Sequence, residues 1–284
     1  MKNLKSKTRV FTRIVMACFL ATTIAACGLI SVDHITDADN NQVVNIGDSV
    51  YALSGEINDF LHSWAGQTFR RYSFSGDMIA DVADQYIDAK NDNPDIDIIF
   101  MDGGANDILI PATLFDPYNC KVDWWESSLS SSCKSLIDDI YVDAVNLLNQ
   151  MDQDGVDKVI YSGYYDLKFG LIGTTALNDA VDYGQVKLSL ACSNSTVDCT
   201  FVNPQPIMTS SDLVVDGVHP TTSGSEKIAG LIWPVLEPLL GGTVDPPPPV
   251  VDPDDLDGDG VVNKRDKCPD TPPGVIVDRK GCAI

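Results

Sequence analysis

The sequence is poor in histidine, in cations and in long apolar runs, and each scarcity excludes something. Only three histidines occur among 284 residues, so any chemistry that needs an imidazole has few candidates. The 19 lysines and arginines are outnumbered by 41 aspartates and glutamates, which gives a formal net charge of -22. A field of this sign repels nucleic acid, so we expect no nucleic-acid partner. The apolar run at 14–26 is too short for a membrane-spanning helix.

The first 26 residues instead have the pattern of a secretory signal. Cations precede the apolar run, which ends in Ile24-Ala25-Ala26-Cys27. Small residues before a cysteine resemble the lipobox, at which bacterial lipoproteins are cleaved and acylated. The resemblance implies that Cys27 is lipidated and anchors the protein in a membrane, since two or more acyl tails give stable anchoring. The alternative is an ordinary signal peptide that is cut nearby.

Export sets the expected compartment and charge. Gly28 follows Cys27, where an aspartate would direct a lipoprotein to the inner membrane, so the resemblance implies an outer-membrane lipoprotein of the bacterial cell envelope. Loss of 1–26 removes five cations and no acids, which takes the formal charge from -22 to -27.

The cysteines form no Cys-x-x-Cys pair, which argues against a zinc or redox motif. Beyond Cys27, six remain as three pairs of sequence neighbours: Cys120 and Cys133, Cys192 and Cys199, and Cys268 and Cys282. Many pairings are possible for six cysteines. An exported protein meets an oxidising compartment, so we expect one local disulfide within each neighbouring pair.

Alternating strand and helix patterns indicate one α/β domain at 43–241. Strands are predicted at 43–46, 69–74, 96–101, 158–164 and 200–203, and helices at 54–64, 78–89, 134–151, 175–190 and 222–240. Such alternation favours a parallel sheet with helices on both faces. The polar segment 27–42 is predicted to be a lipidated tether, with order beginning at Val43. Ser223-Gly224-Ser225-Glu226 predicts a capping box for the last helix.

Two other segments interrupt or follow this pattern. Residues 111–132 form a long insertion rich in serine and aromatic residues, which includes Trp124 and Trp125. Long loops in compact domains are often functional, but tryptophans that merely cover the edge of the core would give the same pattern. Residues 242–254 contain four consecutive prolines and are predicted to be an extended linker.

A candidate nucleophile stands directly after the first strand, in Gly47-Asp48-Ser49-Val50. In open α/β sheets ligands bind outside the carboxyl ends of the strands, and a helix N-terminus there offers backbone N–H groups. The motif alone is also typical of a turn. A serine hydroxyl becomes a good nucleophile only when a neighbouring base takes its proton.

Elimination among the histidines identifies that base. His34 lies in the predicted tether and His62 inside a predicted helix, whereas His219 lies in a strand-to-helix loop, Asp216-Gly217-Val218-His219-Pro220. Asp216 is close enough to accept the other ring N–H, which would set the tautomer of His219. The alternatives are a helix-capping histidine and a turn aspartate.

Donors for a developing oxyanion are expected in two loops at strand ends. Gly76 could offer its N–H after the second strand, and Asn106 could offer its side-chain amide after the third. Glycine and asparagine are also ordinary turn formers.

Four blocks together resemble the SGNH, or GDSL-type, hydrolases: Gly47-Asp48-Ser49-Val50, Gly76, Gly104-Ala105-Asn106-Asp107 and Asp216-Gly217-Val218-His219-Pro220. The resemblance implies a flavodoxin-like three-layer α/β/α sandwich with a five-stranded parallel sheet of order 2-1-3-4-5. It assigns Ser49, Asp216 and His219 as catalytic residues, and the Ser49 and Gly76 N–H groups and the Asn106 side chain as the oxyanion hole. Val50 stands where the family name has leucine.

The activity implied by this resemblance is ester hydrolysis through an acyl-serine, without a catalytic cofactor. The substrate could be a small-molecule, lipid or glycan ester, so a short-chain esterase, a lysophospholipase-like lipase and a polysaccharide deacetylase all stay open. Acyl transfer to another acceptor uses the same chemistry. A non-catalytic, calcium-dependent binding lipoprotein is the alternative of a different class.

The C-terminal residues 255–284 carry a second motif. Candidate calcium ligands follow the spacing of a calcium loop: Asp255, Asp257, Asp259, the Val261 carbonyl, Asn263 and Asp266. Asp266 replaces the glutamate of an EF-hand, and no flanking helices are evident. The segment instead resembles a thrombospondin type 3 repeat, which implies structural Ca²⁺ and a Cys268–Cys282 bridge. The alternative is a disordered acidic tail.

Overall fold

The computed structural model describes residues 32–122, 124, 128–241, 264 and 267–269. The chain divides into two compact units, Met1–Gly242 and Thr243–Ile284. Cys27, Trp125, Cys282 and the candidate calcium ligands at 255–266 lie outside the described residues, so their roles stay predictions from the sequence. Within the described part, no helix has both the length and the apolar character needed to cross a bilayer.

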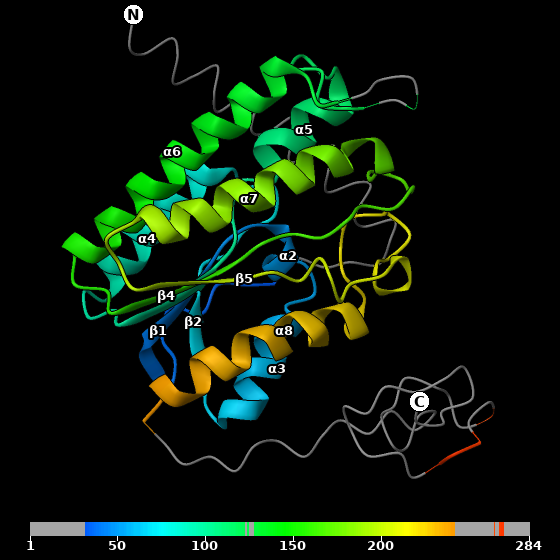
Figure 1. Ribbon diagram of the computed structural model, residues 1–284. Coiled ribbons are helices and arrows are strands. Elements are labelled where there is room, and N and C mark those ends of the chain that lie inside the picture. Colours follow the sequence, from blue (N-terminus) through cyan, green and yellow to red (C-terminus); the bar gives the residue numbers. More distant parts are fainter. Residues whose placement is uncertain (1–31, 123, 125–127, 242–263, 265–266, 270–284) are drawn as a thin grey trace, which may run out of the picture. The chain divides into compact units, whose positions relative to one another are not determined.

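The core of the first unit is a parallel sheet of five strands in the order β2-β1-β3-β4-β5, which confirms the predicted fold class and strand order (Figure 1). The strands are β1 (Asn40–Ile46), β2 (Phe69–Arg71), β3 (Ile98–Met101), β4 (Lys158–Ser162) and β5 (Cys199–Val202). The strand β3, Ile-Ile-Phe-Met, is a continuous apolar run because both of its faces are covered. Ile46 is in register with Met101, so the turns after β1 and β3 begin side by side.

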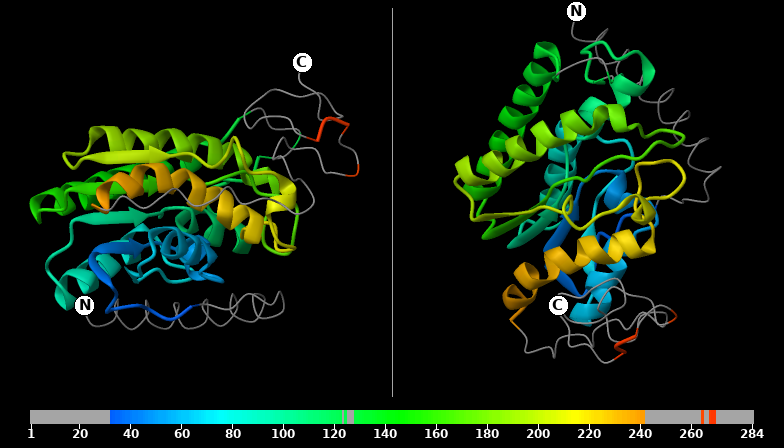
Figure 2. Two further views of the ribbon diagram at one scale, coloured as in Figure 1. Left: turned by 90° about the horizontal axis from the view of Figure 1, so that it is seen from below. Right: turned by 45° about the vertical axis from the view of Figure 1, so that its right-hand side comes forward.

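Helices cover both faces of the sheet (Figures 1 and 2). One face packs against α4 (Ile79–Asp92), α6 (Ser131–Gln153) and α7 (Asn178–Asn194), and the other against α3 (Glu56–Ala65) and α8 (Thr222–Leu236). Short elements complete the unit: α2 (Ser49–Ala52), α5 (Asn106–Leu114), η1 (Thr175–Leu177), η2 (Ser210–Asp212) and η3 (Glu237–Leu239). This is the predicted three-layer arrangement.

Order begins before Val43, so the prediction of a flexible tether up to residue 42 is wrong for its later part. β1 starts at Asn40. Ahead of it, the Val32 N–H donates to the Ala52 carbonyl at 2.9 Å, and Ile35 pairs with Arg71 at the edge of the sheet. Ile35 is held because the backbone groups of Arg71 at the β2 edge would otherwise lack partners.

Several helical boundaries and caps also differ from prediction. The helix predicted at 54–64 starts at Glu56, because Ser54 and Gly55 adopt positive φ angles. The N-cap of α8 is Thr221, whose side chain accepts from the Gly224 N–H, so the predicted capping box at Ser223 is wrong. The insertion 111–132 is in part helical, since α5 runs through Pro111 to Leu114.

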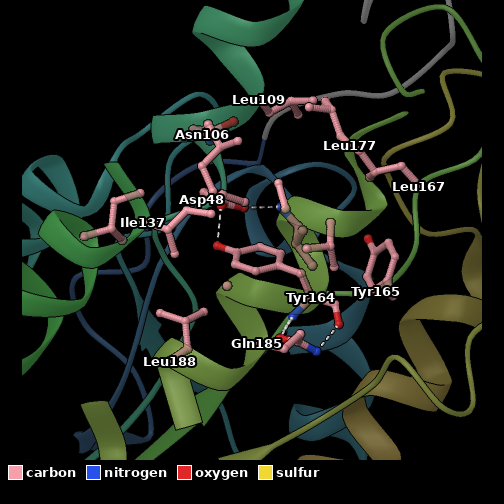
Figure 3. A pocket seen from close by; sticks show the side chains of 18 of the residues that line it. Asp48, Asn106, Leu109, Ile137, Tyr164, Tyr165, Leu167, Leu177, Gln185 and Leu188 are labelled. Atoms are coloured by element: carbon pink, nitrogen blue, oxygen red, sulfur yellow. Dashed lines mark hydrogen bonds between the residues drawn. The ribbon is translucent and has the colours of Figure 1, made fainter. Parts of the chain in front are cut away.

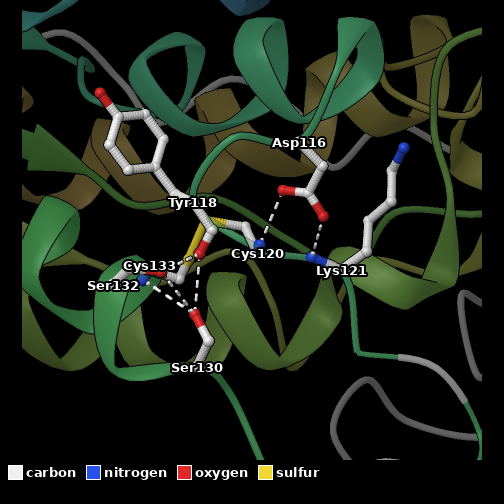
Figure 4. Close-up of a disulfide and its surroundings, with 7 residues drawn as sticks. All are labelled: Asp116, Tyr118, Cys120, Lys121, Ser130, Ser132 and Cys133. Carbon is white, nitrogen blue, oxygen red and sulfur yellow. Dashed lines mark hydrogen bonds between the residues drawn. A yellow bond between two sulfur atoms is a disulfide. The ribbon is translucent and has the colours of Figure 1, made fainter.

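Two disulfides occur among the described residues, Cys120–Cys133 and Cys192–Cys199, with Cα–Cα distances of 5.0 and 5.2 Å. Cys120–Cys133 joins the segment after α5 to the first turn of α6 (Figure 4). The Asp116 carboxylate accepts from the Cys120 N–H at 2.7 Å, and the Tyr118 carbonyl accepts from the Ser130 hydroxyl at 2.8 Å. The disulfide and these hydrogen bonds therefore hold the insertion against the start of α6.

Candidate active site

The turn after β1 presents Ser49 at the carboxyl edge of the sheet. Gly47 has φ +147°, and a Cβ there would lie 2.1 Å from Asp102 Oδ1, so glycine is required. Asp48 is the N-cap of α2, with Oδ1 accepting from the Val50 N–H at 2.9 Å. Ser49 is the first residue of α2, where a backbone N–H has no acceptor within the helix. That N–H is therefore a candidate donor, as the sequence predicts.

The three residues predicted to be catalytic lie in one hydrogen-bonded chain. His219 Nε2 is 2.8 Å from Ser49 Oγ, and His219 Nδ1 is 2.6 Å from Asp216 Oδ2. Asp216 and His219 are only 0% and 3% exposed. With the proton of the neutral ring on Nδ1, Nε2 is free to accept from the serine hydroxyl. This arrangement can remove the proton from a nucleophilic serine.

Asp216 is held as an anion. Burial alone would raise the pKa of its carboxyl, but hydrogen bonds from the His219 ring and from the His219 and Val218 N–H groups outweigh burial and leave the pKa below its ordinary value. The two backbone donors reach Oδ1 at 3.0 and 2.8 Å, which leaves Oδ2 for the imidazole. The carboxylate can therefore stabilise an imidazolium.

Local pairing fixes the loop that carries His219. Leu213 bridges Pro220, and the Val214 N–H donates to the His219 carbonyl at 2.9 Å. Gly217 has φ +83°, and a Cβ there would meet the Lys168 carbonyl at 2.3 Å. The loop is therefore closed on itself and packed tightly against the segment after β4.

The other two predicted oxyanion donors, Asn106 and Gly76, follow strands next to β1. Asn106 begins α5 after β3, is 3% exposed, and donates through Nδ2 to the Asp77 carbonyl at 3.0 Å. Gly76 lies after β2 with φ +88°. An amide nitrogen carries two hydrogens, so Asn106 retains one donor beyond its bond to Asp77.

Sequence reasoning missed the side chains that support the nucleophile turn. Gln85 of α4 bonds both backbone groups of Gly47. Asp102, directly after β3, accepts from the Asp48 N–H at 2.7 Å, and the Tyr164 hydroxyl donates to Asp48 Oδ2 at 2.7 Å. Asp102 could have been found, because an acid that ends an apolar strand lies at the ligand-binding edge. Gln85 gives no such signal.

Asp48 and Asp102 form a buried acidic pair beneath Ser49. Burial raises the pKa of both carboxyls, and the neighbouring Asp48 charge raises the pKa of Asp102 further, well above its ordinary value. Asp102 Oδ2 is buried with no hydrogen-bond partner among the described residues. The pair therefore favours a protonated Asp102.

The other two histidines serve the packing of the domain. His34 lies against the rings of Tyr72 and Phe74, with centroids 5.8 and 6.3 Å apart. His62 Nε2 accepts from the Phe69 N–H at 3.0 Å, and burial lowers the pKa of His62. Within the described ranges, no cluster of His, Cys, Asp or Glu could hold a metal ion.

Solved structures resemble this chain, although no protein-family model and no curated protein matches it. A family 3 carbohydrate esterase from Talaromyces cellulolyticus has a TM-score of 0.52 at 18% identity, over 70% of this chain and 97% of that one. An acetyl xylan esterase has a TM-score of 0.51 at 11% identity, over 68% and 98%. An acetyl esterase variant with an acetate ion has a TM-score of 0.50 at 18% identity, over 70% and 97%.

The chain shares the fold of these esterases.

Within this fold, a pocket opens beside Ser49 and extends between α5, α6 and α7 (Figure 3). Most of its lining is aliphatic or aromatic. The side chains of Leu109, Leu167 and Leu177 lie on one side of Tyr164, and those of Ile137 and Leu188 on the other. Ser49 and Asn106 line the pocket, whereas His219 does not. Trp124, from the insertion 111–132, is 91% exposed and is not part of the lining.

Proposed function

We propose that this chain hydrolyses carboxylic esters through an acyl-serine at Ser49. The observation that carries the proposal is the hydrogen-bonded chain from Ser49 Oγ through His219 to Asp216, with distances of 2.8 and 2.6 Å. Nucleophile, base and orienting carboxylate are the three groups that serine hydrolysis requires, and their geometry matters more than their order in the sequence. The three similar structures are esterases by name, which agrees with this chemistry.

The first half of the reaction forms the acyl-enzyme. Ser49 Oγ attacks the ester carbonyl carbon while His219 Nε2 takes the hydroxyl proton. The carbonyl oxygen becomes an oxyanion, for which the proposed donors are the Ser49 and Gly76 N–H groups and the second Asn106 amide hydrogen. Collapse of this intermediate breaks the bond to the alcohol oxygen, and the alcohol leaves with the proton from His219.

The second half restores the enzyme. A water gives a proton to His219 Nε2 and attacks the acyl carbon, and a second oxyanion forms at the same donors. Its collapse breaks the bond to Ser49 Oγ, which recovers the proton, and the carboxylic acid leaves. An alcohol in place of water would give acyl transfer by the same steps, so the acceptor decides between hydrolase and transferase.

The test is hydrolysis of p-nitrophenyl acetate by the full chain and by Ser49→Ala. We expect the variant to lose at least about 10³-fold in kcat, because no other group replaces the nucleophile. Ser193→Ala is the matched control, since Ser193 is an exposed serine on α7, and it should retain wild-type turnover. Equal turnover by Ser49→Ala and wild type would overturn the proposal.

A further inference from the structure

The pocket beside Ser49 is apolar in a specific sense: away from Ser49 and Asn106, its polar side chains already bond to other protein groups. The Gln185 side chain bonds the Tyr164 N–H and carbonyl. The Tyr165 hydroxyl donates to the Val218 carbonyl at 2.9 Å. The Lys187 ammonium pairs with Asp138 at 2.6 Å. A sugar that enters this pocket would leave most of its hydroxyl groups without a hydrogen-bond partner. A hydrocarbon chain has no hydrogen bonds to water that it would have to give up.

The position of the pocket also shows which side of the ester bond, acyl or alcohol, extends into it. An alcohol leaving group must take its proton from His219, so it lies on the imidazole side of Ser49. His219 is not part of the pocket lining, whereas Ser49 and the candidate oxyanion residue Asn106 are. The group that extends from the carbonyl carbon into this pocket is therefore the acyl chain.

We infer that the pocket between α5, α6 and α7 selects esters with a fatty acyl chain longer than acetyl. This inference rests on the proposed ester hydrolysis and adds its substrate class. Each methylene buried in an apolar site raises kcat/KM by about fourfold. For p-nitrophenyl hexanoate against p-nitrophenyl acetate, full burial of the added methylenes corresponds to roughly 10²-fold.

Gly184 offers a direct way to fill the pocket. It lies within α7 and lines the pocket, and a Cβ at this position would meet nothing within 4 Å. Leucine at 184 would therefore occupy space that the acyl chain needs without a clash at its own Cβ. Leucine also has a higher helix propensity than glycine, so the variant should fold.

Gly230 provides the matched control. It lies within α8, is exposed, and its Cβ would likewise meet nothing within 4 Å. Gly230→Leu makes the same substitution in a helix on the other face of the sheet. It should alter neither chain-length preference nor turnover, and thermal unfolding checks that both variants are folded.

The experiment measures kcat/KM of the full chain and both variants on p-nitrophenyl acetate and hexanoate. We expect wild type to prefer hexanoate, and Gly184→Leu to lose about tenfold or more on hexanoate while acetate stays within about twofold. A preference for acetate by wild type, or an equal loss on both esters in Gly184→Leu, would overturn the inference and leave the proposed function intact. Failure to hydrolyse either ester would instead overturn the proposed function.

Two isomeric esters test which side of the bond occupies the pocket. Ethyl hexanoate and hexyl acetate contain the same atoms, but only the first carries its chain on the acyl side. We expect faster hydrolysis of ethyl hexanoate, followed as acid release at constant pH, and a loss of that preference in Gly184→Leu. Faster hydrolysis of hexyl acetate would assign the pocket to the alcohol and contradict the inference.

Discussion

Gln85 and the backbone of Gly47 form a closed pair of hydrogen bonds. Gln85 Oε1 accepts from the Gly47 N–H at 2.7 Å, and Nε2 donates to the Gly47 carbonyl at 2.8 Å. The same Nε2 donates to Asp77 Oδ2 at 2.8 Å, one residue after Gly76. One side chain of α4 thereby fixes the nucleophile turn relative to the loop proposed to bind the oxyanion.

Gln85→Leu should reduce turnover because it releases both loops. We expect kcat to fall by about 10- to 100-fold with a smaller change in KM, since the loss is one of positioning. Unpaired Gly47 groups should also lower the free energy of unfolding by about 2–3 kcal/mol. Steady-state kinetics and urea unfolding measure the two effects.

Gln85→Glu tests whether the hydrogen bonds of the Gln85 side chain, and not only its packing, hold the two loops in position. It keeps the acceptor for the Gly47 N–H but loses the donor and places a carboxylate beside Asp77. We expect its kcat, relative to that of wild type at the same pH, to rise as pH falls, because protonation of the new carboxylate restores a donor, whereas this ratio should stay constant for Gln85→Leu. Wild-type kcat in Gln85→Leu would contradict the assigned role.

Asn106→Ala tests the proposed oxyanion donor. Removal of one such donor should lower kcat by about 10²–10³-fold, because the bond forms fully only in the transition state. KM should change little. The lost bond to the Asp77 carbonyl should destabilise the fold by about 1 kcal/mol, which thermal unfolding can measure. Asn106→Asp keeps the shape of the side chain but replaces the donor by a carboxylate oxygen, so it should not restore activity. A kcat within about threefold of wild type in either variant would exclude Asn106 as an oxyanion donor.

The sequence was informative wherever one physical requirement dominated. The run at 96–101 predicted a strand because it is rich in apolar residues, which burial on both faces of a sheet demands, and β3 occupies Ile98–Met101 within it. His219 could be identified because only two other histidines compete with it. In contrast, Gln85 sits at a polar position within a helical pattern, and its two bonds to Gly47 depend on a contact across 38 residues. The helix α5 was missed because Asn106 was assigned to a loop at a strand end and the residues from Pro111 to an insertion.

The pocket could not be predicted from sequence patterns. Its walls come from α5, α6 and α7, so the periodicity of one helix says nothing of the space between them. The insertion 111–132 was a candidate functional loop because of its length, whereas its Trp124 is exposed and the pocket is lined largely by leucines and isoleucines.

Asp102 should make stability depend on pH in a direction that can be worked out. Burial, and then the Asp48 charge, hold the pKa of Asp102 well above its ordinary value. The folded state therefore keeps a proton that the unfolded chain releases, so stability is full below about pH 4 and declines as pH rises towards the folded pKa. The neutral variant Asp102→Asn lacks this decline.

The measurement compares the free energy of unfolding of wild type and Asp102→Asn from about pH 5 to about pH 8. Asp107, whose pKa is raised by burial to about 6, contributes to the decline in both proteins and cancels in the difference. We expect the variant to lose less stability across this range and to keep its turnover, since asparagine still accepts from the Asp48 N–H. Asp102→Ala removes that acceptor and should lower both the free energy of unfolding and the turnover. Parallel pH profiles for wild type and Asp102→Asn would refute a protonated Asp102.

The Cys120–Cys133 disulfide should support the pocket as well as the fold. Both cysteines pack in one cluster with Ile137, Leu177 and Ala180, which line the pocket. Replacing both cysteines by serine opens a loop with a sequence separation of 13 and should cost about 2–3 kcal/mol of stability. Replacing Cys192 and Cys199 opens a loop with a separation of only 7 and should cost somewhat less.

The two pairs also predict different effects on substrate choice. Loss of Cys120–Cys133 loosens α6 against the segment after α5, so hexanoate hydrolysis should fall more than acetate hydrolysis. Cys192 and Cys199 lie at the end of α7 and the start of β5 and do not line the pocket, so their removal should lower both rates alike or not at all. Kinetics on both esters, at a temperature where both variants are folded, distinguishes the cases. A selective loss of hexanoate activity in the second variant would mean that stability, and not the pocket wall, controls chain-length preference.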